Sequence, residues 1–299
     1  MKFFKDTLQS ATLLAVVTAF FGGSVNISAK FALEVFHPFT FITIRFFFAT
    51  LFILPFVLKH DELKLRNIKK FFWIGVLGAL NPMLLFIALQ FTLASVSPLI
   101  YAGVPAMTAV YLYLVNKERL NTRQLVGIIL GLIGVGIIVL LPLFEKHIAL
   151  IALKGNILIV IAAITFMLYG IKSKHAQTNL QSSPIALVFY FCLITLLLSI
   201  PFSLFELVKY GVPKNIQFIH FINGMYIGIF GTGVSYLAYQ YALKISSVVT
   251  VSLFTYLQPI FTILLAMIFL NEKITPTFII GGLLAVVGAR LALVSKEIV

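Results

Sequence analysis

The chain consists largely of long runs of apolar residues, joined by short hydrophilic connections. A helix needs about 20 mostly apolar residues to cross the hydrocarbon core of a bilayer. Ten runs meet this requirement, so the sequence predicts an all-α integral membrane protein with ten transmembrane helices. The predicted spans are residues 8–29, 37–58, 71–91, 95–115, 122–142, 153–172, 184–208, 218–243, 247–270 and 275–294.

The composition excludes the main soluble classes. The chain is 61% hydrophobic and 10% charged, whereas soluble domains are about 45–50% apolar and about 25% charged. A soluble enzyme, a secreted disulfide protein and a disordered chain are therefore ruled out. Cys192 is the only cysteine, so neither an internal disulfide nor a cysteine-based metal cluster can form. The net charge of +13 lies mainly in the short loops, which favours a lipid surface rather than nucleic acid as the partner.

The distribution of basic residues predicts the orientation in the cell (inner) membrane. With the N-terminus in the cytoplasm, fifteen Lys and Arg residues fall in cytoplasmic segments and six in outer segments. Because cytoplasmic loops carry the excess of basic residues, both termini are expected in the cytoplasm. The first apolar run follows Lys2 and Lys5 like a signal peptide, but it has no small-x-small cleavage site, so we expect it to remain as an anchor.

An internal repeat divides the chain into two halves, residues 1–143 and 152–295. Each half holds five predicted spans, an odd number, so the halves are expected to have opposite orientations. Inverted repeats place a binding site near the membrane midplane and give alternating access when one half rocks against the other. An offset of 146 superposes Pro38 on Pro184 and Pro55 on Pro201, and an offset of 154 superposes Pro105 on Pro259, Glu118 on Glu272, Gly127 on Gly281 and Gly134 on Gly288.

These motifs resemble the EamA branch of the drug/metabolite transporter superfamily, whose members have ten helices in two homologous halves. The resemblance covers nearly the whole chain and implies transport of a small molecule, often export of an amino acid or related metabolite. Its carriers are Arg45-Phe46 with Ala49, Pro105 through Asn116-Lys117-Glu118-Arg119-Leu120 into Gly127 and Gly134, and Pro259 through Asn271-Glu272-Lys273-Ile274 into Gly281 and Gly288.

Polar residues inside the spans are candidates for substrate binding, because lipid would leave them unpaired. Arg45 is the only charged residue well inside a span, about 12 Å from its outer end. It can pair with helix-end carbonyls or with an anionic group on the substrate, such as a carboxylate. The candidate substrate-binding residues are Arg45, Asn26, Asn81, Tyr101, Tyr236, Tyr239, Gln240 and Tyr256.

Tyr236, Tyr239 and Gln240 recur at helical spacing and form one stripe. The stripe either lines the substrate cavity or bonds neighbouring helices.

Two further sets of residues are candidates for hinges and helix packing. Pro105 and Pro259 interrupt helical hydrogen bonding, either as packing kinks or as hinges that face a cavity. Small residues at spacing four let helix backbones approach closely, within the chain or between the protomers of a homodimer. These small residues are Gly127, Gly131, Gly134, Gly281, Ala285 and Gly288.

The combined interpretation is a secondary transporter that exports a small metabolite. Uptake or exchange by the same fold remains an alternative, because a sequence does not fix direction. A receptor without transport and a membrane-embedded enzyme are further alternatives. An enzyme would need a nucleophile–base pair, paired acids or a histidine cluster within the spans. The spans contain none of these and no P-loop, so no catalytic residue, metal or cofactor is expected.

Overall fold

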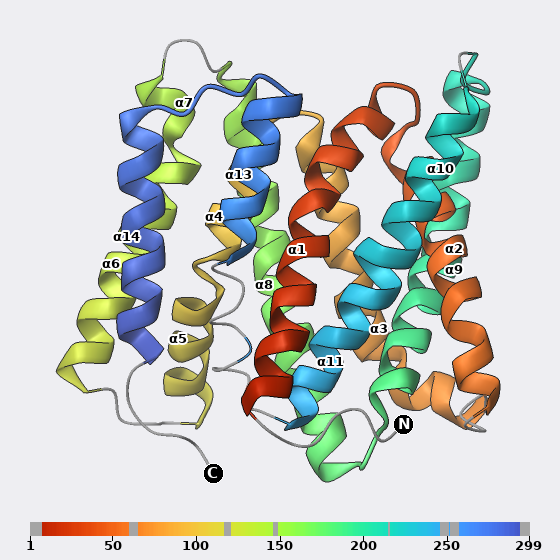
Figure 1. Ribbon diagram of the computed structural model, residues 1–299, viewed down its shortest axis with the longest axis horizontal. Helices are drawn as coiled ribbons and strands as arrows, with labels where there is room; N and C mark the ends of the chain where they lie inside the picture. Colours follow the sequence, from red (N-terminus) through yellow and green to blue (C-terminus); the bar gives the residue numbers. More distant parts are fainter. Residues whose placement is uncertain are drawn as a thin grey trace.

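The computed structural model describes residues 8–59, 65–116, 121–145, 149–214, 216–245, 251 and 257–293, and every element within these ranges is helical. The helices run between two opposite ends of the molecule, and α1 begins at the same end at which α14 finishes (Figure 1). The elements are α1 (Leu8–Leu33), α2 (Pro38–Lys59), α3 (Leu65–Leu89), α4 (Val96–Tyr101), α5 (Val104–Asn116), α6 (Thr122–Val139), α7 (Leu141–Phe144), α8 (Ile151–Asn179), α9 (Pro184–Tyr210), α10 (Phe218–Tyr226), η1 (Ile227–Val234), α11 (Ser235–Ile245), α13 (Leu257–Phe269) and α14 (Pro276–Leu293).

Eight helical segments of the described chain are long and apolar enough to cross a membrane. They correspond to the first eight of the ten predicted spans. Shorter apolar helices, α13 and α14, occupy the places of the ninth and tenth, and part of the ninth lies outside the described residues. The sixth predicted span, residues 153–172, is too short, because α8 continues to Asn179. Its last turns are polar but lie against α11, where Lys174 and Gln177 bond to the neighbouring helix.

The fourth predicted span is divided into α4 and α5 by a break at Ala102 and Gly103. Pro105 lies in the first turn of α5, and Pro259 lies in the first turn of α13. Proline is tolerated in a first turn because the missing amide hydrogen would have no partner inside the helix. Pro105 therefore begins α5, whereas the residues directly before α13 lie outside the described ranges, so the predicted hinge role of the two prolines stays a prediction.

The eighth predicted span is also interrupted, by the π-helical segment η1 between α10 and α11. A π-helix makes i→i+5 bonds, is rare, and is found frequently at functional sites. Mean hydropathy across residues 218–245 carries no signal for this change of helix type, so the sequence predicted one continuous helix here.

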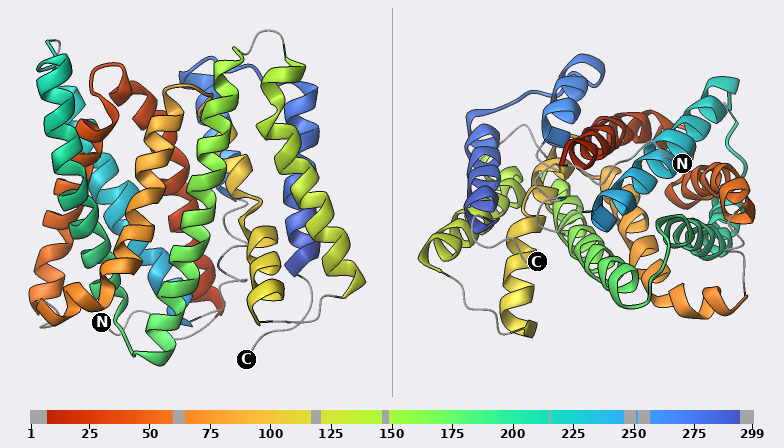
Figure 2. Two further views of the ribbon diagram at one scale, coloured as in Figure 1. Left: turned by 180° about the vertical axis from the view of Figure 1, so that it is seen from behind. Right: turned by 60° about the horizontal axis from the view of Figure 1, so that its bottom comes forward.

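Helices from the first half of the chain pack against helices from the second half. Contacts link α2 to α9, α6 to α14, α3 to both α8 and α9, and α1 to both α11 and α13. The two views in Figure 2 show α6 and α14 side by side at one edge of the molecule, beside α5. Elements from the first 145 residues therefore contact elements from the rest of the chain throughout the fold.

The predicted small-residue faces meet each other where α6 crosses α14. A Cβ atom added at Gly134 would lie 2.6 Å from the Gly281 carbonyl oxygen, and one at Gly288 would lie 2.7 Å from the Gly127 carbonyl oxygen. The backbones of Gly131 and Ala285 would be closer still. These faces therefore hold two helices of one chain together by backbone contact.

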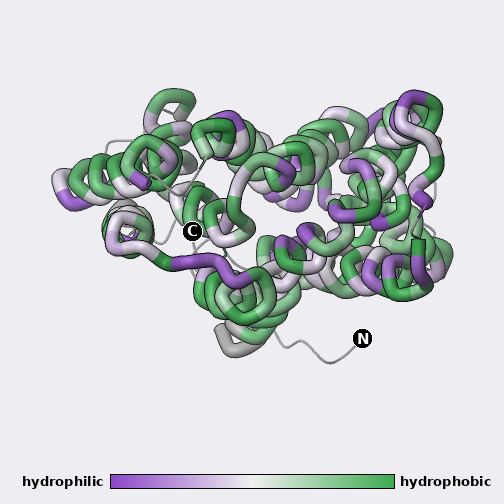
Figure 3. The backbone as a smooth tube through the Cα atoms, turned by 90° about the horizontal axis from the view of Figure 1, so that it is seen from above, coloured by the Kyte–Doolittle hydropathy of each residue, from purple (hydrophilic) through white to green (hydrophobic). Residues whose placement is uncertain are grey.

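The other faces of the helices carry apolar side chains outward. On α6, Leu125, Ile129 and Ile133 are each about half exposed, whereas the small-face glycines Gly127, Gly131 and Gly134 are buried. Figure 3, coloured by hydropathy, shows hydrophobic residues along most of the helical turns. An apolar outer surface is the surface that lipid tails solvate, which fits a multi-pass membrane protein.

Two glutamates of the later part of the chain satisfy helix starts in the earlier part. Glu206 accepts hydrogen bonds from the Phe39 amide (3.1 Å) and from the Thr40 amide (2.8 Å), in the first turn of α2. Glu272 accepts from the amides of Ala94 (2.7 Å) and Ser95 (3.1 Å), directly before α4. First-turn amides have no partner inside a helix, and a carboxylate is favourable there.

Candidate functional site

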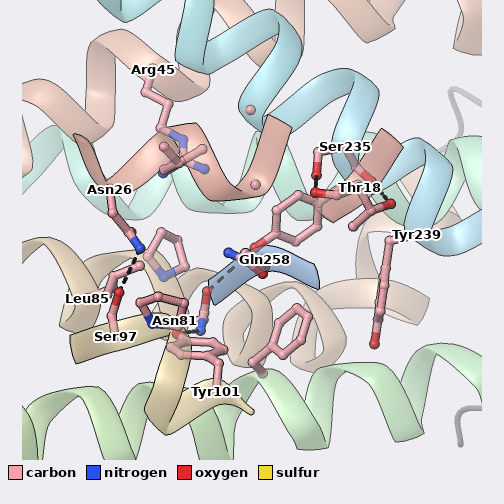
Figure 4. A pocket seen from close by; sticks show the side chains of 17 residues that line it. Thr18, Asn26, Arg45, Asn81, Leu85, Ser97, Tyr101, Ser235, Tyr239 and Gln258 are labelled. Atoms are coloured by element: carbon pink, nitrogen blue, oxygen red, sulfur yellow. Dashed lines mark hydrogen bonds between the residues drawn. The ribbon is translucent and has the colours of Figure 1, made fainter. Parts of the chain in front are cut away.

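A central cavity opens between α1, α2, α3, α4, α8, η1, α11 and α13, with about 720 Å³ of empty space including its mouth (Figure 4). The lining combines aromatic rings, amides and hydroxyls with one arginine. The lining residues are Thr18, Gly22, Val25, Asn26, Arg45, Asn81, Pro82, Leu85, Ser97, Pro98, Tyr101, Phe166, Gly231, Ser235, Tyr236, Tyr239 and Gln258.

Most of the polar residues that the sequence singled out lie together at this cavity. They come from α1, α2, α3 and α4 in the first half of the chain and from α11 in the second half. The predicted residues in the lining are Asn26, Arg45, Asn81, Tyr101, Tyr236 and Tyr239. Tyr256 lies outside the described residues.

Asn81 forms the centre of a polar network on one wall. Its side-chain amide donates to the hydroxyl of Tyr101 and to the carbonyl oxygen of Ala162, the latter at 2.9 Å. The Tyr236 hydroxyl donates to the Asn81 side-chain oxygen at 3.5 Å. Four helices, α3, α4, α8 and α11, thus share one amide group, which fixes the direction in which that group faces the cavity.

The end of the cavity nearest the α3–α4 connection is bridged by polar contacts. Asn26 donates to the Ser97 hydroxyl at 2.7 Å, and Lys30, one turn further along α1, donates to the Thr92 carbonyl oxygen at 2.5 Å. Glu272 bonds the same connection from the segment that precedes α14. Three parts of the chain therefore meet at this end.

Arg45 enters the cavity from α2 and is 3% exposed. Its Nε donates to the Thr232 hydroxyl at 2.7 Å, and its guanidinium carbon lies 5.3 Å and 5.2 Å from the ring centroids of Phe46 and Phe86. Cation–π contact with a ring face stabilises a guanidinium that has left water. Figure 4 shows the guanidinium directed toward the other lining residues.

Aromatic rings form another part of the cavity wall. The Tyr236 ring stacks on Phe191 with centroids 4.7 Å apart, and the Tyr239 ring lies 5.3 Å from that of Phe166. Such rings offer an apolar face together with a polar edge. The wall can therefore accept an amphipathic ligand whose charged end reaches Arg45.

Gln240 is separated from the rest of the predicted stripe. It is fully buried, donates to the Tyr169 hydroxyl at 2.8 Å and accepts from the Gln177 amide at 2.6 Å. Neighbouring residues of a helix point about 100° apart, so Tyr239 faces the cavity while Gln240 faces α8. In the structure, Tyr236 and Tyr239 of the stripe line the cavity, whereas Gln240 bonds the neighbouring helix α8.

Several lining residues were not singled out by the sequence. Thr18, Ser97, Ser235 and Gln258 are visible as polar residues within spans, but a hydroxyl can bond its own helix and then needs no cavity. Thr18 does bond the Leu14 carbonyl oxygen at 2.9 Å. Phe166 has no sequence signal that separates it from any other buried aromatic residue.

The lining residues supply groups that can bind a small molecule. Within the described ranges, no three His, Cys, Asp or Glu side chains are grouped to hold a metal ion. The chemistry that the lining offers is hydrogen bonding, aromatic contact and one positive charge.

The sequence model of the EamA-like transporter family matches residues 9–140 and 153–294. The chain belongs to the EamA-like transporter family. It is therefore a transporter and a multi-pass membrane protein, and the resemblance inferred from its motifs is confirmed.

Relatives of this EamA-like chain include proteins from bacteria and a plant. An uncharacterized transporter of Clostridium kluyveri is 26% identical and covers 94% of this chain and 92% of its own length. An uncharacterized transporter of Haemophilus influenzae is 28% identical, and the match covers 95% of this chain and 94% of the relative. The WAT1-related protein At5g64700 of Arabidopsis thaliana is 27% identical, covering 87% and 82%.

A crystal structure shares the fold, with a TM-score of 0.66, 18% sequence identity and coverage of 95% of this chain and 97% of the other. The architecture described here is thus one that a solved protein adopts.

Proposed function

We propose that this EamA-like chain is a secondary transporter that exports a small metabolite, an amino acid or a related compound, across the cytoplasmic membrane. It works by alternating access between two inverted five-helix repeats, residues 1–143 and 152–295. The observation that carries the proposal is the central cavity, because α1 to α4 line it from one half and α8, η1, α11 and α13 from the other. A site shared between repeats is where rocking of the halves changes its exposure.

The pattern of helix contacts supports the repeat. By the sequence offsets, α1 corresponds to α8, α2 to α9, α5 to α13, α6 to α14, and α3 to the segment from α10 to α11. If the two halves are related by a two-fold axis, each contact has an equivalent in which every helix is replaced by its counterpart. The equivalent of the α3–α8 contact is α11–α1, and that of the α3–α9 contact is η1–α2. The equivalent of the α1–α13 contact is α8–α5. All six contacts are present, as a two-fold relation between the halves requires.

The directions of paired helices support the inversion. Glu206, near the end of α9, bonds the first turn of α2, so these equivalent helices run in opposite directions. Gly134 approaches Gly281 while Gly127 approaches Gly288, so α6 and α14 are also antiparallel. The two stretches matched by the family model, residues 9–140 and 153–294, divide the chain at the same place.

Arg45 supports a carboxylated substrate. A guanidinium inside the protein gains more from an anion than it would in water, because the surroundings are less polar. Its planar fork can donate two parallel bonds to a carboxylate, which lysine does not offer. Within the part of the chain that the structure describes, Arg45 makes no ion pair, so its charge is available to a ligand.

Transport and its direction are tested in cells of one host with and without the chain, by measuring amino acids and related metabolites inside and outside. The control is Arg45→Gln at matched abundance in the membrane. We expect at least one carboxylated compound to fall inside and rise outside with the wild-type protein alone. A rise inside would establish uptake, and identical pools in all cells would contradict the transport proposal.

The orientation is tested by thiol labelling in a Cys192→Ala background, because Cys192 is the only cysteine and is buried. Asn179→Cys and Lys273→Cys place thiols at exposed positions on opposite ends of the molecule. With cytoplasmic termini, an impermeant reagent on intact cells labels position 273 and spares position 179 until the cells are opened. Labelling of position 179 in intact cells would contradict this orientation.

A further inference from the structure

The π-helical segment η1 touches α2 at the residue that carries the buried charge. A Cβ atom added at Gly228 would lie 2.5 Å from the Arg45 carbonyl oxygen and 2.8 Å from the Phe48 Cβ atom. Only a glycine lets the η1 backbone approach α2 this closely. The π segment and the Arg45 backbone are therefore held together as one unit.

Thr232 of η1 is fully buried, and both of its hydrogen-bonding roles are fixed. Its hydroxyl donates to the carbonyl oxygen of Ile227, five residues earlier, at 3.1 Å. A hydroxyl has one proton, so the remaining lone pairs serve as acceptors, and one of them receives the Arg45 Nε–H at 2.7 Å. The Ile227 carbonyl thus orients the hydroxyl, and the hydroxyl orients the arginine.

This arrangement leaves one edge of the guanidinium for a ligand. The Nε edge is taken by Thr232, and the flanks lie near the rings of Phe46 and Phe86. The two Nη groups form the remaining edge, and Arg45 lines the cavity. An anion that binds this edge meets two parallel N–H donors, which is the geometry that a planar carboxylate accepts.

We infer that Thr232 is a positioning residue for substrate recognition: it presents the two Nη groups of Arg45 end-on to a carboxylate in the cavity. The inference rests on the proposed function, which supplies the carboxylated substrate. It adds that selectivity for the acid depends on the hydroxyl of Thr232 in the π segment. Thr232 is not one of the residues that line the cavity.

The test uses the purified full-length protein and a panel of L-amino acids with the matching L-amino-acid amides. The thermal unfolding temperature is measured at increasing concentrations of each compound, because a ligand that binds the folded state raises this temperature with the logarithm of one plus the ratio of ligand concentration to Kd. The wild-type protein should bind at least one acid more tightly than its amide. Thr232→Val keeps the shape of the side chain and removes the hydroxyl, whereas Thr232→Ser keeps the hydroxyl as the matched control.

We expect Thr232→Val to weaken binding of the acid about tenfold to a hundredfold, the loss that follows when one hydrogen bond to a charged group is removed. Binding of the amide should change less than threefold, and Thr232→Ser should bind the acid nearly as well as the wild-type protein. Equal binding of the acid by Thr232→Val, or an equal loss for acid and amide, would overturn the inference.

A double-variant cycle keeps the inference testable if Thr232→Val unfolds readily, with Thr232→Ala taking its place. Because Thr232 acts through Arg45, removing its hydroxyl in an Arg45→Lys background should weaken acid binding no further. An additional loss in that background would overturn the inference. Failure of the proposed function has a different signature, since the wild-type protein itself would then bind no acid in the panel.

Discussion

The α6–α14 crossing and the helices around the cavity are built from similarly apolar spans but hold together in different ways. At the crossing, glycines bring the backbones into contact. Around the cavity, amides, hydroxyls and aromatic rings are linked by hydrogen bonds, and space remains between them. Substitution should therefore damage folding at the crossing, whereas at the cavity it should change recognition while the fold persists.

The largest effect is expected for Gly288→Val at the crossing. The new side chain would collide with the backbone of Gly131, and overpacking of this kind destabilises by about 3 kcal/mol or more. We expect little folded protein in the membrane, as measured by fluorescence size-exclusion chromatography of detergent extracts. Gly136→Ala is the matched control in the same helix pair, because nothing lies within 4 Å of its Cβ position. Normal abundance of Gly288→Val would remove the distinction between the two regions.

The next effect is expected for Arg45→Lys in the cavity. Lysine keeps the positive charge but loses the planar fork, so transport of a carboxylated substrate should weaken about tenfold to a hundredfold. Uncharged substrates should be affected much less, and protein abundance should match the wild type. The measurement is initial transport rate against substrate concentration. An abundance loss like that of Gly288→Val would mean that Arg45 serves the fold.

Gln240→Leu tests the buried contact between α8 and α11. Loss of its bonds with Tyr169 and Gln177 should lower the free energy of unfolding by about 0.6–2 kcal/mol. The substrate KM should stay unchanged because Gln240 is not part of the lining. Thermal unfolding in detergent and transport kinetics together check this pair of outcomes. A shifted KM at normal stability would return Gln240 to the substrate site.

The smallest effect is expected for Tyr239→Phe, one residue away. Tyr239 lines the cavity, and its hydroxyl would lie 2.5 Å from a Cβ atom at Gly170. Removing the hydroxyl should change the KM about threefold, as loss of a neutral hydrogen bond would, and leave the unfolding temperature unaltered. Comparison with Gln240→Leu in one set of membranes sharpens the contrast. A fall in stability without a change in KM would contradict the proposed role.

The sequence was sufficient where a signal is local. Apolar run length predicted eight segments of spanning length, and the cost of burying polar groups identified six of the cavity residues. Spacing of small residues identified both faces of the α6–α14 crossing. These signals depend on each residue and its own helix, so no knowledge of neighbouring helices was needed.

The sequence was insufficient where the conformation or role of a residue depends on which helix packs against it. The π segment forms where η1 packs on α2, and its glycines alone do not distinguish it from a close α-helical contact. Gln240 and Tyr239 are adjacent polar residues, and only the position of α8 separates their roles. Glu206 lies near the end of a predicted span, and its partners lie in α2, far away in sequence.

The hydrogen bonds of Glu206 and Glu272 at the starts of α2 and α4 also have a consequence for the order of events during biosynthesis. The amides of Phe39, Thr40, Ala94 and Ser95 leave the ribosome well before residues 206 and 272 are translated. Until then, water and lipid headgroups must serve those donors. The earlier half of the chain therefore enters the bilayer before the carboxylates that bond its helix starts, and these bonds form only after residues 206 and 272 have been translated.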